Sequence, residues 1–412
     1  MRSHALALLA LVLPGVARAD LLRVDAAGGP GVDHDNLQDA VDAASEGDVI
    51  LIAAGQYVGF DLSGKSLTLV AEPDAAVAIQ DSLLGLAAPV SSHAAEIRDL
   101  GAHQEVVLRG LSFRGTHPLS VHVDNVDLHD NQGRILIEDC DLVPTNAESR
   151  PLRAVNCADL VLTRCALARA ETPPEADVLA VLLRESNVSF YECVVFGGHG
   201  ETSLVPGVEL GYAGNGVRQI GGSTFAADTT FWGGDAQTSP LGQCALDGGF
   251  GFQLLSGQLT HLGSSFLGGA PAGCVGGGMG APGLGLDVDP AAQASALPGE
   301  PRRLTANSPV PVGGTLTETY AGVPGDLVFL LYATTSLNPL SGLPWAGTLV
   351  PGQPFFVSPK GVLDASGTTS TSASIAGAPA ARAAVLQLQA AHLDAQLELW
   401  LSSPSSVVVY QP

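Results

Sequence analysis

Ile135-Leu136-Ile137-Glu138-Asp139-Cys140 is one of three similar blocks in the middle of this 412-residue chain. The other two are Leu160-Val161-Leu162-Thr163-Arg164-Cys165 and Val188-Ser189-Phe190-Tyr191-Glu192-Cys193. In each block, apolar residues stand five and three places before the cysteine and again two places after it. Alternation with a period of two is typical of a β-strand, and strands that recur at this distance predict coils that stack on one another. The chain is therefore expected to form a solenoid of β coils.

The same frame extends beyond these blocks in both directions. Leu111 stands at the marker position upstream, and Thr229 and Ser264 stand at it downstream, at intervals of roughly 25–36 residues. A repeat of this kind buries its apolar side chains only by stacking on its neighbours. The composition agrees, because 50 glycines, 27 prolines and 5% aromatic residues favour many short strands and tight turns over helical repeats.

The chain is strongly acidic. It has 41 Asp and Glu residues against 18 Lys and Arg residues, which gives a formal net charge of -23. Such a surface repels nucleic acid and acidic membranes, so neither is expected as a partner. It would also repel a polyanion such as pectate unless Ca²⁺ or a local basic patch intervened. The length favours two or three domains.

The first 19 residues have the order of a secretory signal peptide. Arg2 precedes an apolar stretch over residues 5–12 and the small-residue sequence Ala17-Arg18-Ala19, so cleavage after Ala19 is expected. No other stretch reaches the roughly 20 uninterrupted apolar residues that a membrane helix needs. The mature protein is therefore expected to be secreted without a membrane span, to the extracellular space, the cell surface or a periplasm.

Six cysteines are available for disulfides in an exported protein. Cys140, Cys165 and Cys193 share one frame position and would form a column with a strand spacing of about 4.8 Å. That spacing permits one bridge but equally suits buried free thiols, which is the interpretation we favour. Cys244 and Cys274 lie in glycine-rich turn regions and are the better candidates for a disulfide. The chain contains no C-x-x-C pair, so the cysteines do not indicate a zinc site.

An amphipathic helix is expected near the N-terminus, over residues 35–44. Asp35 is available as its N-cap and Gly47 as its stop, and a strand follows at once. One face of the helix is apolar, and it consists of Leu37, Ala40, Val41 and Ala44.

The sequence around this helix resembles a known family. Three segments carry the resemblance: Asp35-Asn36-Leu37-Gln38-Asp39-Ala40-Val41, Glu46-Gly47-Asp48-Val49-Ile50 and Ala54-Gly55-Gln56-Tyr57. They are similar to the N-terminal cap and first coil of secreted right-handed parallel β-helix proteins of the pectin lyase-like group. The resemblance implies a right-handed parallel β-helix, which we place at residues 20–287. Its open end would be covered by the helix, which protects an otherwise unpaired sheet edge.

The composition changes beyond the repeats. Residues 288–302 are rich in Pro and Ala and are expected to be a linker. Residues 303–412 contain short strand-like segments between Gly, Pro and Ser turns, which predicts a C-terminal antiparallel β-sandwich. The predicted fold class is therefore all-β, with an N-terminal capping helix, a parallel β-helix and a β-sandwich.

The turns between residues 197 and 285 are unusually rich in glycine. Their spacing partly matches calcium-binding nonapeptide repeats, but Phe252 stands where such a repeat needs Asp, and no nine-residue period continues. Because glycine adopts a positive φ without strain, we interpret these runs as tight corners of successive coils.

One column of the repeat carries charge at the position just before each marker. An arginine with acids one coil above and one coil below it fits a solvated ion ladder, in which each exposed pair stabilises the fold by about 0–1 kcal/mol. They also fit a site in which the carboxylates bind Ca²⁺ and the arginine faces a uronic acid. We favour the ladder, because arginine is a poor base. The binding candidates are Asp139, Arg164, Glu192 and Asp228, flanked by Gly110 and Gly263, and in an enzyme Arg164, Asp139 and Glu192 would be catalytic.

A second polar group lies between two coils. Its residues could form a metal or acid–base site, because His122 and Asp124 would share one strand face. A polar loop is the interpretation we favour. The group consists of His117, His122, Asp124, Asp127, His129 and Asp130.

Two tripeptides resemble motifs of polygalacturonases: Gly198-His199-Gly200 and Asn125-Val126-Asp127. However, the chain contains no Asp-Asp pair and no Arg-x-Lys sequence. The two carboxylates that such hydrolases need as acid and base are therefore not assembled by the sequence pattern.

These observations favour an exported, non-catalytic extracellular or cell-surface module that binds carbohydrate or a partner. The alternative is a polysaccharide lyase or glycoside hydrolase of the pectin lyase-like group, and a purely structural surface protein is a third hypothesis. An enzyme needs at least two acid–base or metal groups from neighbouring coils to meet in a groove. No cofactor is expected, apart from Ca²⁺ if the charged column is a binding site.

Overall fold

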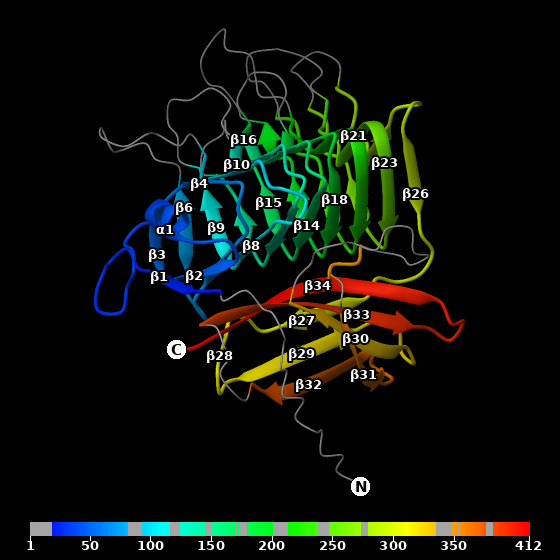
Figure 1. The fold of residues 1–412 in the computed structure, drawn as a ribbon. Coiled ribbons are helices and arrows are strands. Elements are labelled where there is room, and N and C mark those ends of the chain that lie inside the picture. Colours follow the sequence, from blue (N-terminus) through cyan, green and yellow to red (C-terminus); the bar gives the residue numbers. More distant parts are fainter. Residues whose placement is uncertain are drawn as a thin grey trace, which may run out of the picture.

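The structure is a computed structural model. It describes residues 19–80, 93–115, 124–144, 150–169, 171–172, 179–200, 213–237, 247–272, 279–334, 348–352, 355–375 and 382–412. Figure 1 shows a stack of parallel strands that lies along a second body of antiparallel strands. Within the described parts of the chain, no helix has the length and apolar character needed to cross a membrane.

The stack is a parallel β-helix with three faces, which we call sheets 1, 2 and 3. Sheets 1 and 2 are continuous through two long strands, β21 (Asn215–Ala227) and β23 (Phe252–Leu262), whose second halves belong to sheet 1 and first halves to sheet 2. The other strands of sheet 1 are β1 (Leu21–Val24), β2 (Asp48–Ile52), β5 (Leu67–Ala71), β8 (Glu105–Arg109), β11 (Arg134–Glu138), β14 (Asp159–Thr163), β18 (Asn187–Tyr191) and β26 (Gln293–Ala296).

Sheets 2 and 3 complete each coil. Sheet 2 adds β4 (Phe60–Ser63), β7 (Ala95–Arg98), β10 (Asp124–His129), β13 (Arg150–Val155), β17 (Leu179–Arg184) and β25 (Leu286–Val288). Sheet 3 consists of β3 (Gly55–Val58), β6 (Val77–Gln80), β9 (Leu111–Arg114), β12 (Asp141–Leu142), β15 (Ala166–Ala168), β19 (Val194–Phe196), β22 (Thr230–Trp232) and β24 (Ser265–Leu267). A small sheet pairs β16 (Glu171–Thr172) with β20 (His199–Gly200).

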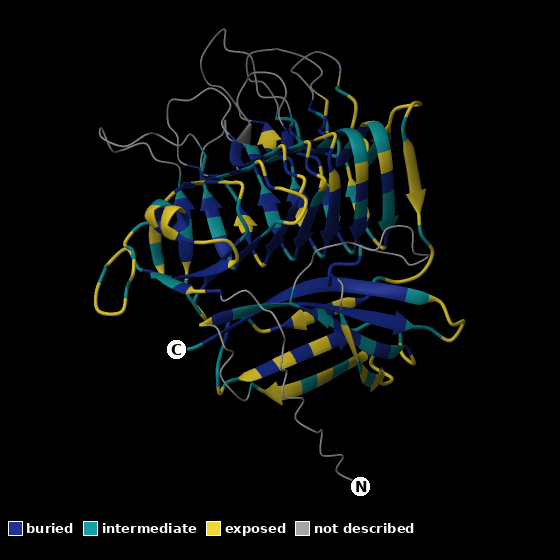
Figure 2. Cartoon of the chain, in the orientation of Figure 1, coloured by how far each residue is buried: buried dark blue, intermediate teal, exposed yellow. Residues whose placement is uncertain are grey.

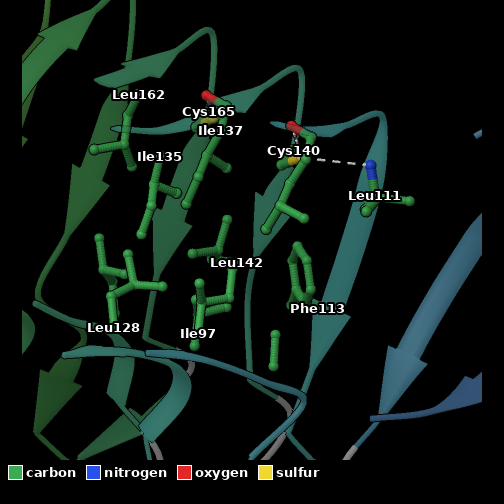
Figure 3. Packing of buried hydrophobic residues seen from close by; sticks show 14 of the residues in the cluster. Ile97, Leu111, Phe113, Leu128, Ile135, Ile137, Cys140, Leu142, Leu162 and Cys165 are labelled. Atoms are coloured by element: carbon green, nitrogen blue, oxygen red, sulfur yellow. Dashed lines mark hydrogen bonds between the residues drawn. The ribbon is translucent and has the colours of Figure 1, made fainter. Parts of the chain in front are cut away.

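The repeated frame of the sequence is the register of sheet 1. Ile137 pairs with Leu162, and Leu162 pairs with Phe190 in the next coil. Side chains of this column and of the facing strands fill the interior, where Ile97 comes from sheet 2 and Phe113 from sheet 3 (Figure 3). Stacking therefore buries the apolar positions that no single coil could cover.

The helix α1 (Leu37–Ala43) lies at the N-terminal end of the stack, as predicted. Leu37 and Val41 are buried, and they belong to the same apolar core as the side chains of the first strands. The N-cap is Asn36 and not Asp35, because the Asn36 side chain accepts a hydrogen bond from the backbone N–H of Asp39 at 2.8 Å. The last helical residue is Ala43, so the helix stops before Gly47.

The described glycines of these runs lie at the boundary between sheets 3 and 2, and the expectation of positive φ holds for Gly198 but not for Gly234 or Gly249. A backbone ladder runs from coil to coil, because Gly234 N–H donates to Gly214 O at 2.8 Å and Gly249 N–H donates to Gly234 O at 2.9 Å. Gly269 continues the ladder by donating to Gly249 O at 2.9 Å. A Cβ atom on Gly234 would lie 1.6 Å from the carbonyl oxygen of Gly198. Glycine is therefore required here by the close approach of neighbouring backbones.

The predicted linker at residues 288–302 needs correction. Residues 293–296 form β26, which pairs in parallel with the second half of β23, so the β-helix extends beyond residue 287. All four residues of β26 are exposed. Its sequence is Gln-Ala-Ser-Ala, and without any large apolar residue the sequence pattern did not reveal it.

The C-terminal body is the predicted antiparallel β-sandwich. One sheet contains β27 (Arg303–Ala306), β29 (Thr315–Ala321) and β32 (Thr368–Ser374). The other contains β28 (Val310–Pro311), β34 (Leu399–Tyr410), β33 (Ala383–Leu393), β30 (Leu327–Ala333) and β31 (Phe356–Val362). Tyr320 and Val328 lie in the core between the two sheets. Strand β34 is buried along almost its whole length, because it lies between that core and the β-helix (Figure 2).

Candidate functional site

The charged column predicted from the sequence occupies the corner between sheets 1 and 3. Asp139, Arg164, Glu192 and Asp228 all have left-handed backbones, with φ between 50° and 55°. Gly110 and Gly263, at the two ends of the column, have φ values of 71° and 61°. The column therefore marks one sharp turn that every coil repeats, and a left-handed turn residue is a Gly or a strained polar residue.

The sandwich covers part of this column. Arg109 lies 3.0 Å from carboxylate oxygens of both Glu138 and Asp139. Arg164 binds Asp139 at 2.7 Å and also pairs with Glu138. The side chain of Arg164 is only 16% exposed and that of Glu138 only 4%. The interpretation as a solvated ladder is therefore wrong for Arg164, whose partner Asp139 stays exposed.

The same charges hold backbone groups of the sandwich. Both oxygens of Glu138 accept hydrogen bonds at 2.7 Å, one from the Ser405 hydroxyl and one from the Ser406 N–H. Arg109 donates to Ala306 O at 2.7 Å, and Arg164 donates to Leu304 O at 3.3 Å. These contacts join β11 and its neighbours to β27 and β34.

The far end of the column is held in the same way. Arg303 of the sandwich pairs with Glu192, at 3.7 Å, and with Asp228. Burial opposes the charge of Arg164, but Glu138 and Asp139 outweigh it and raise the pKa of Arg164. A guanidinium with a raised pKa stays charged and cannot act as a base. The column is thus an interface between the two bodies.

A different polar cluster lies on the outward face of sheet 2. Arg150 donates to Asp124 at 2.6 Å, and Arg153 makes a two-pronged contact with Asp127 at 2.7 and 2.9 Å. Arg153 also lies 3.8 Å from Asp124, so the two ion pairs share one network. Glu96 precedes Asp127 in the same row of the sheet. We call Glu96, Asp124, Asp127, Arg150 and Arg153 the sheet-2 cluster.

Two histidines border the sheet-2 cluster. His93 Nδ1 lies 2.7 Å from Asp124 O, and its Nε2 lies 4.0 Å from Asp127. His129 contacts Glu96 at 3.0 Å and Asp130 at 3.2 Å. Burial opposes protonation of His129, but these carboxylates outweigh it and raise its pKa. The outward face of β7 and β10 thus holds hydrogen-bond donors and acceptors in fixed positions.

Burial sets the protonation of the innermost carboxyl. Desolvation raises the pKa of Asp124, although the neighbouring Arg150 opposes the shift. Its neighbour Asn125 turns into the wall of the β-helix, where its side-chain amide donates to Phe113 O at 2.9 Å. Within the Asn125-Val126-Asp127 sequence, only Asp127 belongs to the sheet-2 cluster.

The structure separates the other predicted residues. His199 lies at the glycine-rich corner, where its Nδ1 accepts a hydrogen bond from the Asp235 N–H at 3.1 Å. Cys140, Cys157, Cys165 and Cys193 are buried free thiols, and burial raises the pKa of Cys140 to about 12. Four predicted residues lie outside the described parts of the chain: His117, His122, Cys244 and Cys274.

No group of three or more His, Cys, Asp or Glu side chains could hold a metal ion in the ranges that the structure describes. Sequence reasoning missed Arg150 and Arg153 as partners of the acids in β10. A signal was present, because each ion pair joins residues 26 positions apart, which is the length of one coil. Pairing opposite charges at the coil period would have found this cluster.

No family model matches the chain, and no curated protein matches it. Among solved structures, the chain is similar to the enzymatically active domain of tailspike protein 4 of bacteriophage CBA120. The identity is 10%, the TM-score is 0.19, and the match covers 80% of this chain and 62% of that chain. The matched part is thus less than two thirds of that protein's length, and a TM-score this low carries no argument about activity.

Proposed function

We propose that this protein is an exported module that binds a polysaccharide along the outward face of sheet 2. One observation carries the proposal: ion pairs at hydrogen-bond distance fix acidic and basic side chains of neighbouring coils on a face that the sandwich leaves uncovered. Sheet 1 cannot serve, because its outward side chains are engaged by β27 and β34. The sequence resemblance to the pectin lyase-like group also supports a polysaccharide as the ligand.

The chemistry of the sheet-2 cluster suits a polyhydroxylated chain. Sugar hydroxyls both donate and accept, so they can bridge the partly exposed carboxylate of Glu96 and guanidinium of Arg153, which Asp127, itself only 10% exposed, holds in place. Mutual pairing holds these side chains in place before a ligand arrives, which reduces the entropy lost on binding. Arg184, which is exposed on the neighbouring strand β17, adds positive charge to a protein of net charge -23.

Hydrolysis is the second candidate function. It is favoured by the raised pKa of Asp124 and by the position of Arg153, which contacts both Asp124 and Asp127. A hydrolase needs one carboxyl as acid and another as base. Here arginines bind both, Asp124 at 2.6 Å and Asp127 at 2.7 Å, so neither is free to transfer a proton. Binding without turnover is therefore the better-supported function.

The test is affinity electrophoresis of the full mature chain on a panel of neutral and acidic polysaccharides, with and without EDTA. Arg153→Ala is expected to weaken retention at least ten-fold on the polysaccharide that binds. Arg382→Ala is the matched control, because this exposed arginine lies on the sandwich and its removal changes the net charge equally.

Equal retention of Arg153→Ala and the wild-type protein would refute the sheet-2 site. Reducing ends or unsaturated uronides released by the wild-type protein, and lost in Asp127→Asn, would establish the enzymatic alternative. Export is tested separately by N-terminal sequencing of the protein from the culture medium or periplasm, where we expect Asp20 as the first residue.

A further inference from the structure

The outward face of sheet 3 changes character along the stack. In its middle strands, Arg114 of β9 and Asp141 of β12 carry charge. From β15 to β24 the outward positions carry none, and three large apolar side chains are exposed: Val194 by 49%, Trp232 by 47% and Leu267 by 42%. An exposed apolar patch on an otherwise highly charged protein is typical of a binding surface.

The strand register places these side chains in two rows. Phe196, Trp232 and Leu267 are direct neighbours on β19, β22 and β24. Val194, Thr230 and Ser265 form the parallel row on the same strands. We call these six residues the aromatic platform. It combines an apolar row with a row that contains two hydroxyl groups.

The platform is held rigidly from one side. The rings of Phe196 and Trp232 meet edge to face, with centroids 6.3 Å apart and an interplanar angle of 83°. His199 packs on Phe196 at 4.9 Å, and the Asp235 N–H fixes His199 in turn. The backbone beneath is also fixed, because Gly197 N–H donates to Trp232 O at 2.9 Å. Trp232 therefore offers an oriented ring.

The size of the platform decides what can bind it. Three strands about 4.8 Å apart, with three residues each at about 3.3 Å, span roughly 10 Å by 7 Å. A stable interface between proteins needs about 800 Å² per partner, which is several times more. A patch of this size instead matches one or two sugar rings. Because the platform carries no charge, it has no partner group for a carboxylate or a phosphate.

We propose that the aromatic platform binds uncharged pyranose units. The C–H face of a pyranose would pack on the ring of Trp232, as apolar surface packs on an aromatic side chain, while hydroxyls of Thr230 and Ser265 bind sugar hydroxyls. The platform lies on a different face from the sheet-2 cluster. The inference rests on the proposed function only for the class of ligand, and it adds a second contact with separate chemistry.

The test uses the full mature chain with two neutral probes, cellohexaose and maltohexaose, in titrations followed by calorimetry and by tryptophan fluorescence. Trp232→Ala is expected to weaken binding of the preferred hexamer at least ten-fold, and Trp232→Phe to restore part of the loss. Val58→Ala is the matched control, because Val58 is 54% exposed on the same face but lies in β3, in a row with Gln80 and Arg114. It is expected to bind as the wild-type protein does.

The two proposals fail separately. The platform is tested by comparing Trp232→Ala with Val58→Ala on the two hexamers, whereas the sheet-2 cluster is tested by comparing Arg153→Ala with Arg382→Ala on polysaccharides. The platform assignment is overturned if neither hexamer binds the wild-type protein, or if Trp232→Ala binds as tightly as Val58→Ala. It is also overturned if sedimentation shows a dimer that Trp232→Ala dissociates, because the patch would then join two copies of the chain. Unchanged thermal unfolding of Trp232→Ala confirms that the variant is folded.

Discussion

Glu105 lies at the interface between the β-helix and the sandwich, where it contacts Gln387. One carboxylate oxygen accepts a hydrogen bond from the Gln387 side chain at 2.8 Å, and the other is buried without a partner. Desolvation raises the pKa of Glu105 to about 7, although Arg134 and Gln387 both oppose the shift. The folded protein therefore holds a proton that the unfolded chain releases at a lower pH. A residue of the docking surface thus couples stability to pH.

The stability of the protein is expected to fall as the pH rises from about 4.5 to about 7. The raised pKa means that the folded state binds more protons than the unfolded state in this window. The contribution of Glu105 to the free energy of unfolding is therefore largest below the unfolded pKa and is lost by about pH 7. The full effect is at most about 3 kcal/mol. Glu105→Gln is expected to unfold at a higher temperature than the wild-type protein at pH 8.

Thermal unfolding of both proteins between pH 4 and pH 8.5 measures this. The difference in melting temperature should shrink as the pH falls, whereas the exposed control Glu398→Gln should follow the wild-type curve throughout. A constant difference across the whole range would contradict the raised pKa.

At the scale of elements, the glycine ladder decides how the coils close. Gly198, Gly234 and Gly269 follow strands of sheet 3, and Gly214 and Gly249 precede strands of sheet 2. The two sets alternate along the ladder, and each step is a backbone hydrogen bond. The bonds measure 2.8 to 3.1 Å and leave no space for a side chain between successive layers. Glycine at this corner is a packing requirement of the stack and not only a means of turning.

Gly234→Ala is expected to destabilise the protein by about 1–3 kcal/mol, because its Cβ atom would overlap the backbone of Gly198. Gly101→Ala is the matched control. Its Cβ atom would meet the Gln104 side chain at an ordinary 3.5 Å, so the change should stay within about 0.5 kcal/mol. Urea unfolding of both variants measures the difference. Similar losses in the two variants would mean that the neighbouring layers move apart easily.

At the scale of the molecule, the sandwich packs along the length of sheet 1. Its strands β27 and β34 contact successive coils. One apolar cluster contains Val107 and Tyr191 of sheet 1 together with Val350 and Trp400. A second cluster joins Val49 and Leu51 to Val408. Buried ion pairs of Glu138 with Arg109 and Arg164 add to this contact. The two bodies are therefore expected to unfold together.

Arg109→Ala is expected to cost about 3–5 kcal/mol, because it removes a buried partner of Glu138 and Asp139 together with three hydrogen bonds to the sandwich. Arg98→Ala is the comparison. Arg98 also pairs with two acids, Glu96 and Asp99, but it is 43% exposed, so about 0–1 kcal/mol is expected. Chemical unfolding of the two variants tests this. Equal losses would show that the docked arginines contribute no more than surface ones.

Much of the architecture could be predicted from residues close together in the chain. The Ile137, Leu162 and Phe190 positions predicted the strand register, since stacking leaves one side of each strand in the core. The apolar face of residues 35–44 predicted the cap. The edge strand β26 could not be predicted, because an exposed strand needs no apolar pattern.

The sequence by itself determined that Asp139, Arg164 and Glu192 stack at one position of consecutive coils, because that position follows from the repeat. Only the tertiary structure decided what faces them. Arg164 donates to Leu304 O, and Glu192 pairs with Arg303. Both partners lie more than a hundred residues away in the chain, and no local periodicity connects them. Local patterns report which side of a strand faces the core, whereas a docked surface depends on the shape and charge of a second folded body. Hence the column was visible in the sequence, and its contacts with the sandwich were not.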